Sequence, residues 1–161
     1  MTFDISRYRH GYSIGAGAVV LCGQKILLVR LSYGSSQRQW SLPGGYVEPE
    51  ETIDVTIKRE VLEETGVSAE VEGLLAARSR VLANENSLYL VFLLQAATED
   101  TQPDGVEVCE ACFFTLEEAQ ALPDMTPMTH LIVARVAQGD LRLLQPIQVP
   151  PYATSEFVLF L

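Results

Sequence analysis

Polar positions divide the chain into short apolar segments, and most of these segments have the composition of β-strands. Gly23-Gln24 separates two of them, which predicts a β-hairpin with a two-residue turn. Within a later segment the run LYLVFLL is continuously apolar, and this pattern predicts a strand that is buried on both faces. The predicted strands are residues 15–22, 25–32, 68–81, 87–97 and 107–114.

Helix signals occur in the segments 52–65, 115–122 and 126–138. Thr52 or Asp54 is suited to cap the start of the first helix. Gly66 stands where a C-terminal glycine belongs, and Pro127 suits the first turn of the third helix.

The remaining segments connect these elements. Residues 32–39 and 98–105 are polar loops, and 40–45 (WSLPGG) predicts a short strand that ends in a Pro-Gly-Gly break. Residues 141–161 are apolar with three prolines, and we assign no element to them. The order of strands and helices predicts one domain, residues 1–161, built as an α/β sandwich around a mixed β-sheet.

The chain of 161 residues is acidic, with a net charge of −10. Non-specific nucleic-acid binding depends on basic residues that neutralise phosphates, so this charge argues against nucleic acid as a partner. No apolar run approaches the ~20 residues that span a membrane, and the N-terminus has no apolar core like that of a signal peptide. We therefore expect a cytoplasmic protein that acts away from membranes. The three cysteines (Cys22, Cys109, Cys112) are too few for a disulfide framework, so we expect reduced thiols.

Negative charge is concentrated between Gly44 and Val67, where six glutamates and one aspartate stand against two basic residues. Glu60, Glu63 and Glu64 lie within an arc of about 100° if this segment is helical. Like charges at this spacing repel. One interpretation is a solvated charged surface. We favour the other, a hard divalent cation bound by carboxylates, main-chain carbonyls and substrate phosphates, because the preceding glycines let main-chain carbonyls approach this helix face.

The spacing of this stretch resembles the signature of the Nudix family. Gly45 is followed by five residues and Glu51, and seven further residues lead to REVLEETGV at 59–67. Every specified position of the signature matches, and WSLPGG resembles the lead-in of the family. The resemblance implies an α/β/α sandwich with a central mixed sheet. It also implies an enzyme that hydrolyses a nucleoside diphosphate linked to another moiety.

The same resemblance implies residue roles. Arg59 would pair with Glu51 and hold the junction between loop and helix. Glu63 is the first candidate for the general base, and Glu107 or Glu110 is the second. The expected ligands of Mg²⁺ or Mn²⁺ are the carbonyl of Gly44 and the carboxylates of Glu60, Glu63 and Glu64.

Substrate contacts are expected outside the signature. Arg78 and Arg80 are two positions apart in a predicted strand, so they share a face and could clamp a phosphate, although exposed arginines are common. Tyr46, together with Tyr33 and Trp40, could stack on a base, and core packing is the alternative for Trp40. Glu107 is a further candidate for substrate contact, and an exposed carboxylate without a function is the alternative.

The sequence leaves the substrate open. A nucleoside diphosphate derivative is expected, and both dNTP-like and sugar-nucleotide compounds fit. The alternatives to the hydrolase are a non-catalytic nucleotide-binding sensor module and an isomerase that acts on a diphosphate. The C-terminal FVLFL, residues 157–161, either adds an edge strand at a homodimer interface or packs within its own domain.

Overall fold

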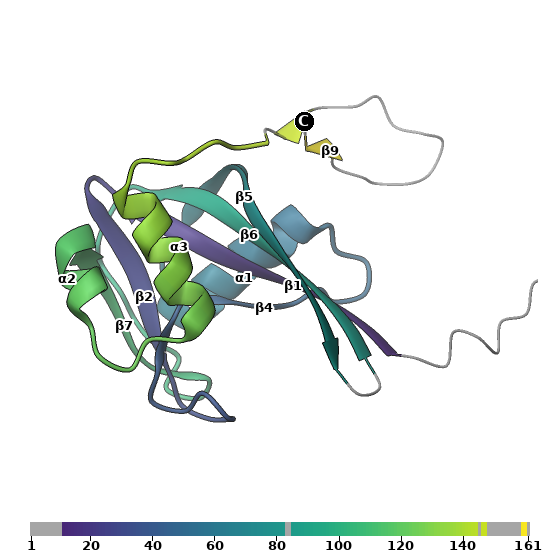
Figure 1. Ribbon diagram of the computed structural model, residues 1–161, viewed down its shortest axis with the longest axis horizontal. Coiled ribbons are helices and arrows are strands. Elements are labelled where there is room, and N and C mark those ends of the chain that lie inside the picture. The colour runs from purple at the N-terminus through teal and green to yellow at the C-terminus, as the bar shows by residue number, and fades with distance from the viewer. Residues whose placement is uncertain (1–10, 83–84, 145, 148–158, 161) are drawn as a thin grey trace, which may run out of the picture.

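The computed structural model describes residues 11–82, 85–144, 146–147 and 159–160 (Figure 1). Among these residues, no helix is long and apolar enough to cross a membrane. The three cysteines are free thiols, as expected. The elements in chain order are β1 Gly11–Cys22, β2 Lys25–Leu31, β3 Trp40–Ser41, β4 Gly44–Tyr46, α1 Ile53–Thr65, β5 Ala69–Leu82, β6 Glu85–Ala96, β7 Val108–Thr115, α2 Leu116–Ala121, α3 Pro127–Ala137, β8 Pro146–Ile147 and β9 Leu159–Phe160.

One mixed sheet organises the molecule, with strand order β3-β2-β1-β6-β5 and with β7 beside β2. β1 and β6 are parallel and paired from Gly11 to Leu21, whereas β1 meets β2 only at the hairpin end. Beyond the hairpin, β1 and β2 diverge. β4 pairs antiparallel with the middle of β1, from Gly15↔Tyr46 to Gly17↔Gly44. This divergence places the short glycine strand β4 beside α1.

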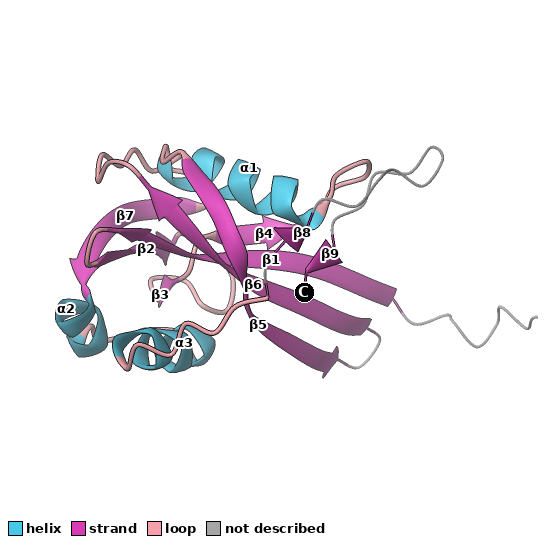
Figure 2. Cartoon of the chain, turned by 90° about the horizontal axis from the view of Figure 1, so that it is seen from above, coloured by secondary structure: helices cyan, strands magenta, loops and turns pink. Residues whose placement is uncertain are grey.

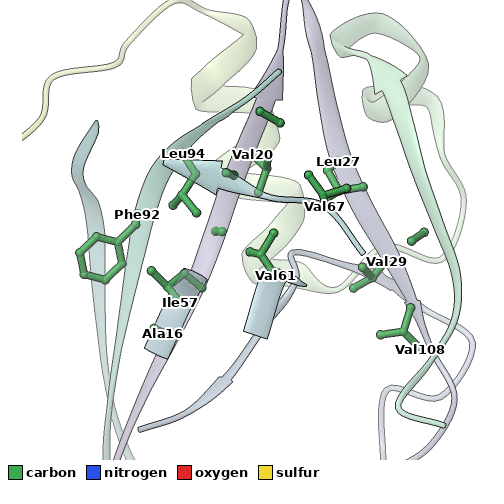
Figure 3. Close-up of a cluster of buried hydrophobic side chains, with 14 residues drawn as sticks. Ala16, Val20, Leu27, Val29, Ile57, Val61, Val67, Phe92, Leu94 and Val108 are labelled. Atoms are coloured by element: carbon green, nitrogen blue, oxygen red, sulfur yellow. The ribbon is translucent and has the colours of Figure 1, made fainter. Parts of the chain in front are cut away.

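Helices cover both faces of the sheet, as Figure 2 shows: α1 lies on one face, and α2 and α3 lie on the other. The layers confirm the α/β/α sandwich that the sequence predicted. Each face has its own apolar cluster. On the α1 side, Ile57 and Val61 of the helix pack with Phe92 and Leu94 of β6, and all four side chains are fully buried (Figure 3).

Most boundaries agree with the sequence patterns to within a few residues. The hairpin turn at Gly23-Gln24 is present. Within the run LYLVFLL, Val91 to Leu94 of β6 are buried as predicted, but Leu88 at its start is 41% exposed, so burial on both faces holds only for the second half. Gly66 ends α1 in the left-handed conformation, at φ 71°. Thr52 occupies the N-cap position of α1, but its side chain makes no capping hydrogen bond.

The predicted strand at 40–45 is wrong in one respect, because it is two strands, β3 and β4. Pro43 lies between them and has no N–H to donate to a ladder. Its carbonyl instead accepts from the backbone N–H of Ala18 at 3.0 Å, which holds the break against β1.

The C-terminal segment contributes a small pairing within the chain. Leu159–Phe160 of β9 pairs antiparallel with Pro146–Ile147 of β8. The rest of FVLFL, at 157, 158 and 161, lies outside the described residues. A homodimer through this segment stays a prediction.

We predict that Ile57→Ala lowers the free energy of unfolding by about 2–5 kcal/mol, because it leaves a cavity between α1 and the sheet. Val55 of the same helix is 51% exposed, and Val55→Ala is the matched control, with an expected change within about 0.5 kcal/mol. Urea denaturation of both variants measures the difference. Equal losses would show that α1 is not anchored through its buried face.

Candidate functional site

Arg59 is the centre of the acidic network on α1. Its Nε donates to Oε1 of Glu51 at 2.6 Å, and its Nη2 donates to Oε2 of the same carboxylate at 3.1 Å. Its Nη1 donates to Glu60 at 2.9 Å and to Glu63 at 3.0 Å. Hydrogen bonds from Arg59 and from the Thr56 hydroxyl lower the pKa of Glu51 to about 2. One guanidinium therefore offsets the repulsion among three of the carboxylates.

Glu64 has a different environment. Its side chain is buried, with the residue only 5% exposed, and it accepts a hydrogen bond from the backbone N–H of Gly44 at 2.8 Å. Burial raises the pKa of Glu64 to about 8, and the negative charges of Glu60 and Glu107 act in the same direction. Burial also raises the pKa of Glu60, partly opposed by Arg59. These carboxyls lie where ionisation without a cation is costly.

Two glycines let β4 approach this helix. A Cβ on Gly45 would collide with the carboxylate of Glu60, and a Cβ on Gly44 would collide with the carbonyl oxygen of Ala16. Gly44 also has a backbone φ of 150°, which residues other than glycine rarely adopt. Gly45 is therefore required for the contact between β4 and α1, and Gly44 for the pairing of β4 with β1.

A loop brings Glu107 to the same place from the start of β7. The carboxylate of Asp104 accepts from the backbone N–H groups of Val106, Glu107 and Val108, at 2.9–3.1 Å. The backbone of this loop bonds the end of α1, with Asp104 N donating to Glu64 O at 3.3 Å. The Tyr33 hydroxyl then donates to Oε2 of Glu107 at 2.9 Å. These contacts fix both the backbone and the side chain of Glu107.

The groups surround one cavity of about 370 Å³. Eight of the predicted site residues line it: Tyr33, Gly44, Tyr46, Arg59, Glu60, Glu63, Glu64 and Glu107. Its other lining residues are Leu31, Gly45 and Glu48. Glu51 is not among the lining residues, because it is the partner of Arg59 rather than a wall of the cavity.

The two predicted phosphate-clamp arginines lie on β5. Arg78 donates to the Ser87 hydroxyl at 3.0 Å, and its guanidinium carbon stands 5.2 Å from the centre of the Tyr89 ring. Arg80 is exposed. Neither residue is among those that line the cavity, and their contact with a phosphate stays a prediction.

Two other candidates have different partners. Glu110 pairs with Arg30 at 2.9 Å and does not line the cavity. Trp40 is 7% exposed and packs edge-on against Phe114, with ring centres 5.1 Å apart, so it belongs to the core. Sequence reasoning missed Asp104 and the bond between Tyr33 and Glu107. The Pro-Asp-Gly turn at 103–105 was a signal for a carboxylate that organises a loop.

The residues fit a hard divalent cation in their chemistry, because oxygen donors with excess negative charge surround the cavity. Among the described residues, however, no three acidic, histidine or cysteine side chains are already grouped around one ion position. Arg59 holds Glu60 and Glu63, and the Gly44 N–H holds Glu64. A cation would replace these hydrogen bonds with coordination by the same oxygens.

Comparison with known proteins identifies relatives. Residues 11–135 match the family model described as NUDIX domain. Human "Nucleoside diphosphate-linked moiety X motif 6" is 40% identical over 128 residues, which cover 77% of this chain and 40% of that protein. "ADP-ribose pyrophosphatase" of Methanocaldococcus jannaschii is 29% identical over 124 residues, covering 74% and 72%. The chain spans about two fifths of the length of the human relative.

A solved structure shows the same fold. The crystal structure of MutT NUDIX hydrolase from Burkholderia pseudomallei superposes with a TM-score of 0.67 at 26% identity. The match covers 78% of this chain and 98% of that one.

Glu64 generates a prediction for stability against pH. Its pKa is about 8 in the folded protein, against an ordinary value of 4.5 for a glutamate exposed to water. Between these values the folded state holds a proton that the unfolded state has released, so the free energy of unfolding falls as pH rises from about 5 to about 8. Glu64→Gln keeps an oxygen acceptor for the Gly44 N–H and removes the titration. We expect its free energy of unfolding, from urea denaturation in EDTA, to fall less over this range by at least ~1 kcal/mol.

The low pKa of Glu51, about 2, keeps that group ionised throughout this range, so it does not contribute to the difference. The same pH dependence in both proteins would show that Glu64 ionises as freely in the folded chain as in the unfolded one.

Proposed function

This chain belongs to the Nudix hydrolase family, and we propose that it hydrolyses a nucleoside diphosphate linked to another moiety, with Mg²⁺ or Mn²⁺ as cofactor. The observation that supports this most directly is the cavity where three carboxylates of α1 meet Glu107 beside the glycines of β4. The archaeal relative is named ADP-ribose pyrophosphatase, and this supports the same substrate class.

In this proposal the cation is held by oxygen atoms of Glu60, Glu63, Glu64 and the carbonyl of Gly44. When bound, a divalent cation neutralises diphosphate oxygens and lowers the pKa of an attacking water. Within the described lining of the cavity, Arg59 is the one basic residue, so a bound cation would add most of the positive charge that a diphosphate meets. Arg59 is already held by Glu51 through two hydrogen bonds, so its role is to keep α1 in register with the preceding loop.

Glu107 is our candidate for the proton acceptor. The three α1 carboxylates are assigned to the cation, which leaves Glu48 and Glu107 as the other carboxylates of the described lining. We choose Glu107 because its negative charge acts on Glu60 and Glu64, and because the Tyr33 hydroxyl holds it. Glu63, the first candidate from the sequence, is assigned to the cation here. Glu110, the other alternative, is bound by Arg30 outside the cavity. A general base at this position would accept a proton from water as the water attacks phosphorus.

The nucleoside would contact Tyr46 at the rim of the cavity. Tyr46 is 64% exposed and lines the cavity, so its ring is available to a base or a ribose. Stacking on such a ring does not depend on which base is present. This supports a class of nucleoside diphosphate derivatives rather than a single compound.

We expect the purified protein to hydrolyse at least one of ADP-ribose, NADH, a dinucleoside polyphosphate, a dNTP and a sugar nucleotide, with Mg²⁺ or Mn²⁺. Glu60→Gln and Glu64→Gln should each lower kcat/KM by at least about 100-fold, since each removes a charge that holds the cation. Release of phosphate-containing products, separated by ion-exchange chromatography, is the measurement. Glu110→Gln is the comparison and should leave kcat/KM within about two-fold, because its carboxylate lies outside the cavity.

Three outcomes would count against the proposal. Hydrolysis that continues in EDTA would remove the cation from the mechanism. Full activity in both the Glu60 and Glu64 variants would remove the site. Tight nucleotide binding without turnover would favour the sensor module.

A further inference from the structure

Tyr33 is an exposed residue of the loop 32–39 whose contact the proposed hydrolysis does not use. It is 59% exposed, lines the cavity, and donates its hydroxyl to Glu107 at 2.9 Å. We infer that Tyr33 is a positioning residue, which holds the carboxylate of Glu107 toward the acidic face of α1. The inference rests on the proposed function for the chemistry that Glu107 performs, but the positioning itself is testable without it.

Backbone hydrogen bonds fix the main chain of Glu107, but they do not act on its carboxylate. The Asp104 carboxylate accepts from the Glu107 N–H, and the Glu107 carbonyl accepts from Ser32 N–H at 2.9 Å. The carboxylate, however, faces Glu60 and Glu64, whose pKa values its charge helps to raise. Like charges favour rotation of such a side chain outward to water. A donor on the cavity side is needed to oppose that rotation.

The Tyr33 hydroxyl is that donor, and its neutrality matters. Arg59 holds the carboxylates of Glu51, Glu60 and Glu63, and Arg30 holds that of Glu110. A cationic partner for Glu107 would add a positive charge that competes with a divalent cation for the same carboxylates. A phenol hydroxyl orients the carboxylate and leaves its negative charge in place. Within the part of the chain that the structure describes, the bond engages Oε2 of Glu107, which leaves Oε1 for the reacting water.

The loop that carries Tyr33 is held by its own hydrogen bonds. Gln37 Nε2 donates to the Ser32 carbonyl at 2.7 Å, and the backbone N–H of Arg38 donates to the Leu31 carbonyl at 2.8 Å. Arg30 Nε in turn donates to the Arg38 carbonyl at 2.9 Å. The position of Tyr33 is therefore set by β2 and its loop, whereas Glu107 belongs to the loop before β7. The bond between the two side chains joins these two walls of the cavity.

Tyr33→Phe is the decisive variant, because it removes the hydroxyl and keeps the ring. We expect it to lower kcat about 10-fold with KM within about two-fold, as expected when a proton acceptor is misplaced and binding is kept. In a Glu107→Gln background the same change should have no further effect. Tyr12→Phe is the matched control, since Tyr12 is 62% exposed and lies outside the cavity, and it should leave both constants unchanged.

A stacking role for Tyr33 gives the opposite pattern. Tyr33→Phe would then retain activity, while Tyr33→Ala would raise KM. That result, or effects of Tyr33→Phe and Glu107→Gln that multiply in the double variant, would overturn the inference.

The carboxyl carbon resonance of Glu107, assigned by comparison with Glu107→Gln in ¹³C NMR without added metal, tests the positioning independently of turnover. We expect this resonance to move in Tyr33→Phe and to stay in place in Tyr12→Phe. An unmoved resonance in Tyr33→Phe overturns the inference whatever the activity. A moved resonance in a protein that hydrolyses no compound of the panel supports the positioning and counts against the proposed hydrolysis.

Discussion

The contact between the glycines of β4 and the acidic face of α1 is the constraint on which the rest of the structure depends. Glu64 is buried against the Gly44 N–H, and Glu60 occupies the space that a side chain on Gly45 would need. Neither contact is possible unless β1 and β2 diverge and leave room for β4. The split in the sheet, the two glycines and the orientation of α1 are therefore one arrangement. Its result is a row of carboxylates beside main-chain amides and carbonyls.

That arrangement is electrostatically unfavourable by itself, and the chain offsets the cost unequally. Arg59 compensates Glu51, Glu60 and Glu63, while Glu64 has a single N–H and a raised pKa. A buried carboxyl with a pKa near 8 favours its neutral form near neutral pH, which lowers the repulsion in the absence of a cation. Such a site lowers the free energy of unfolding, and the apolar clusters on the two sheet faces must offset this loss. Carboxyl groups whose pKa values are shifted and that lie in a cavity are typical of functional sites.

The sequence predicted the elements and the acidic signature because both depend on local spacing. The intervals of three and four residues between Glu60, Glu63 and Glu64 determine a helix face, and eight of the predicted site residues do line one cavity. Contacts between segments that are distant in the sequence could not be predicted in this way. Nothing near Tyr33 indicates that the loop before β7 will bring Glu107 within 2.9 Å of it. Arg78 and Arg80 share the predicted strand, but only the sheet register reveals that Arg78 packs over Tyr89. The partners of Tyr33 and Arg78 depend on which distant segments lie side by side in the fold, and local sequence propensity does not reveal this.

The charges of the cavity also determine the order in which it can be filled. Its described lining has five glutamates, at 48, 60, 63, 64 and 107, and one arginine that is already bound to Glu51. A diphosphate that approaches this lining alone meets like charge, and screening by salt is weak inside a partly enclosed cavity. A divalent cation meets the opposite field and is attracted by it. We therefore expect the cation to enter first or together with the diphosphate as a complex. Tyr33 extends this logic to Glu107, since a neutral donor orients that carboxylate without reducing the negative field that draws the cation in.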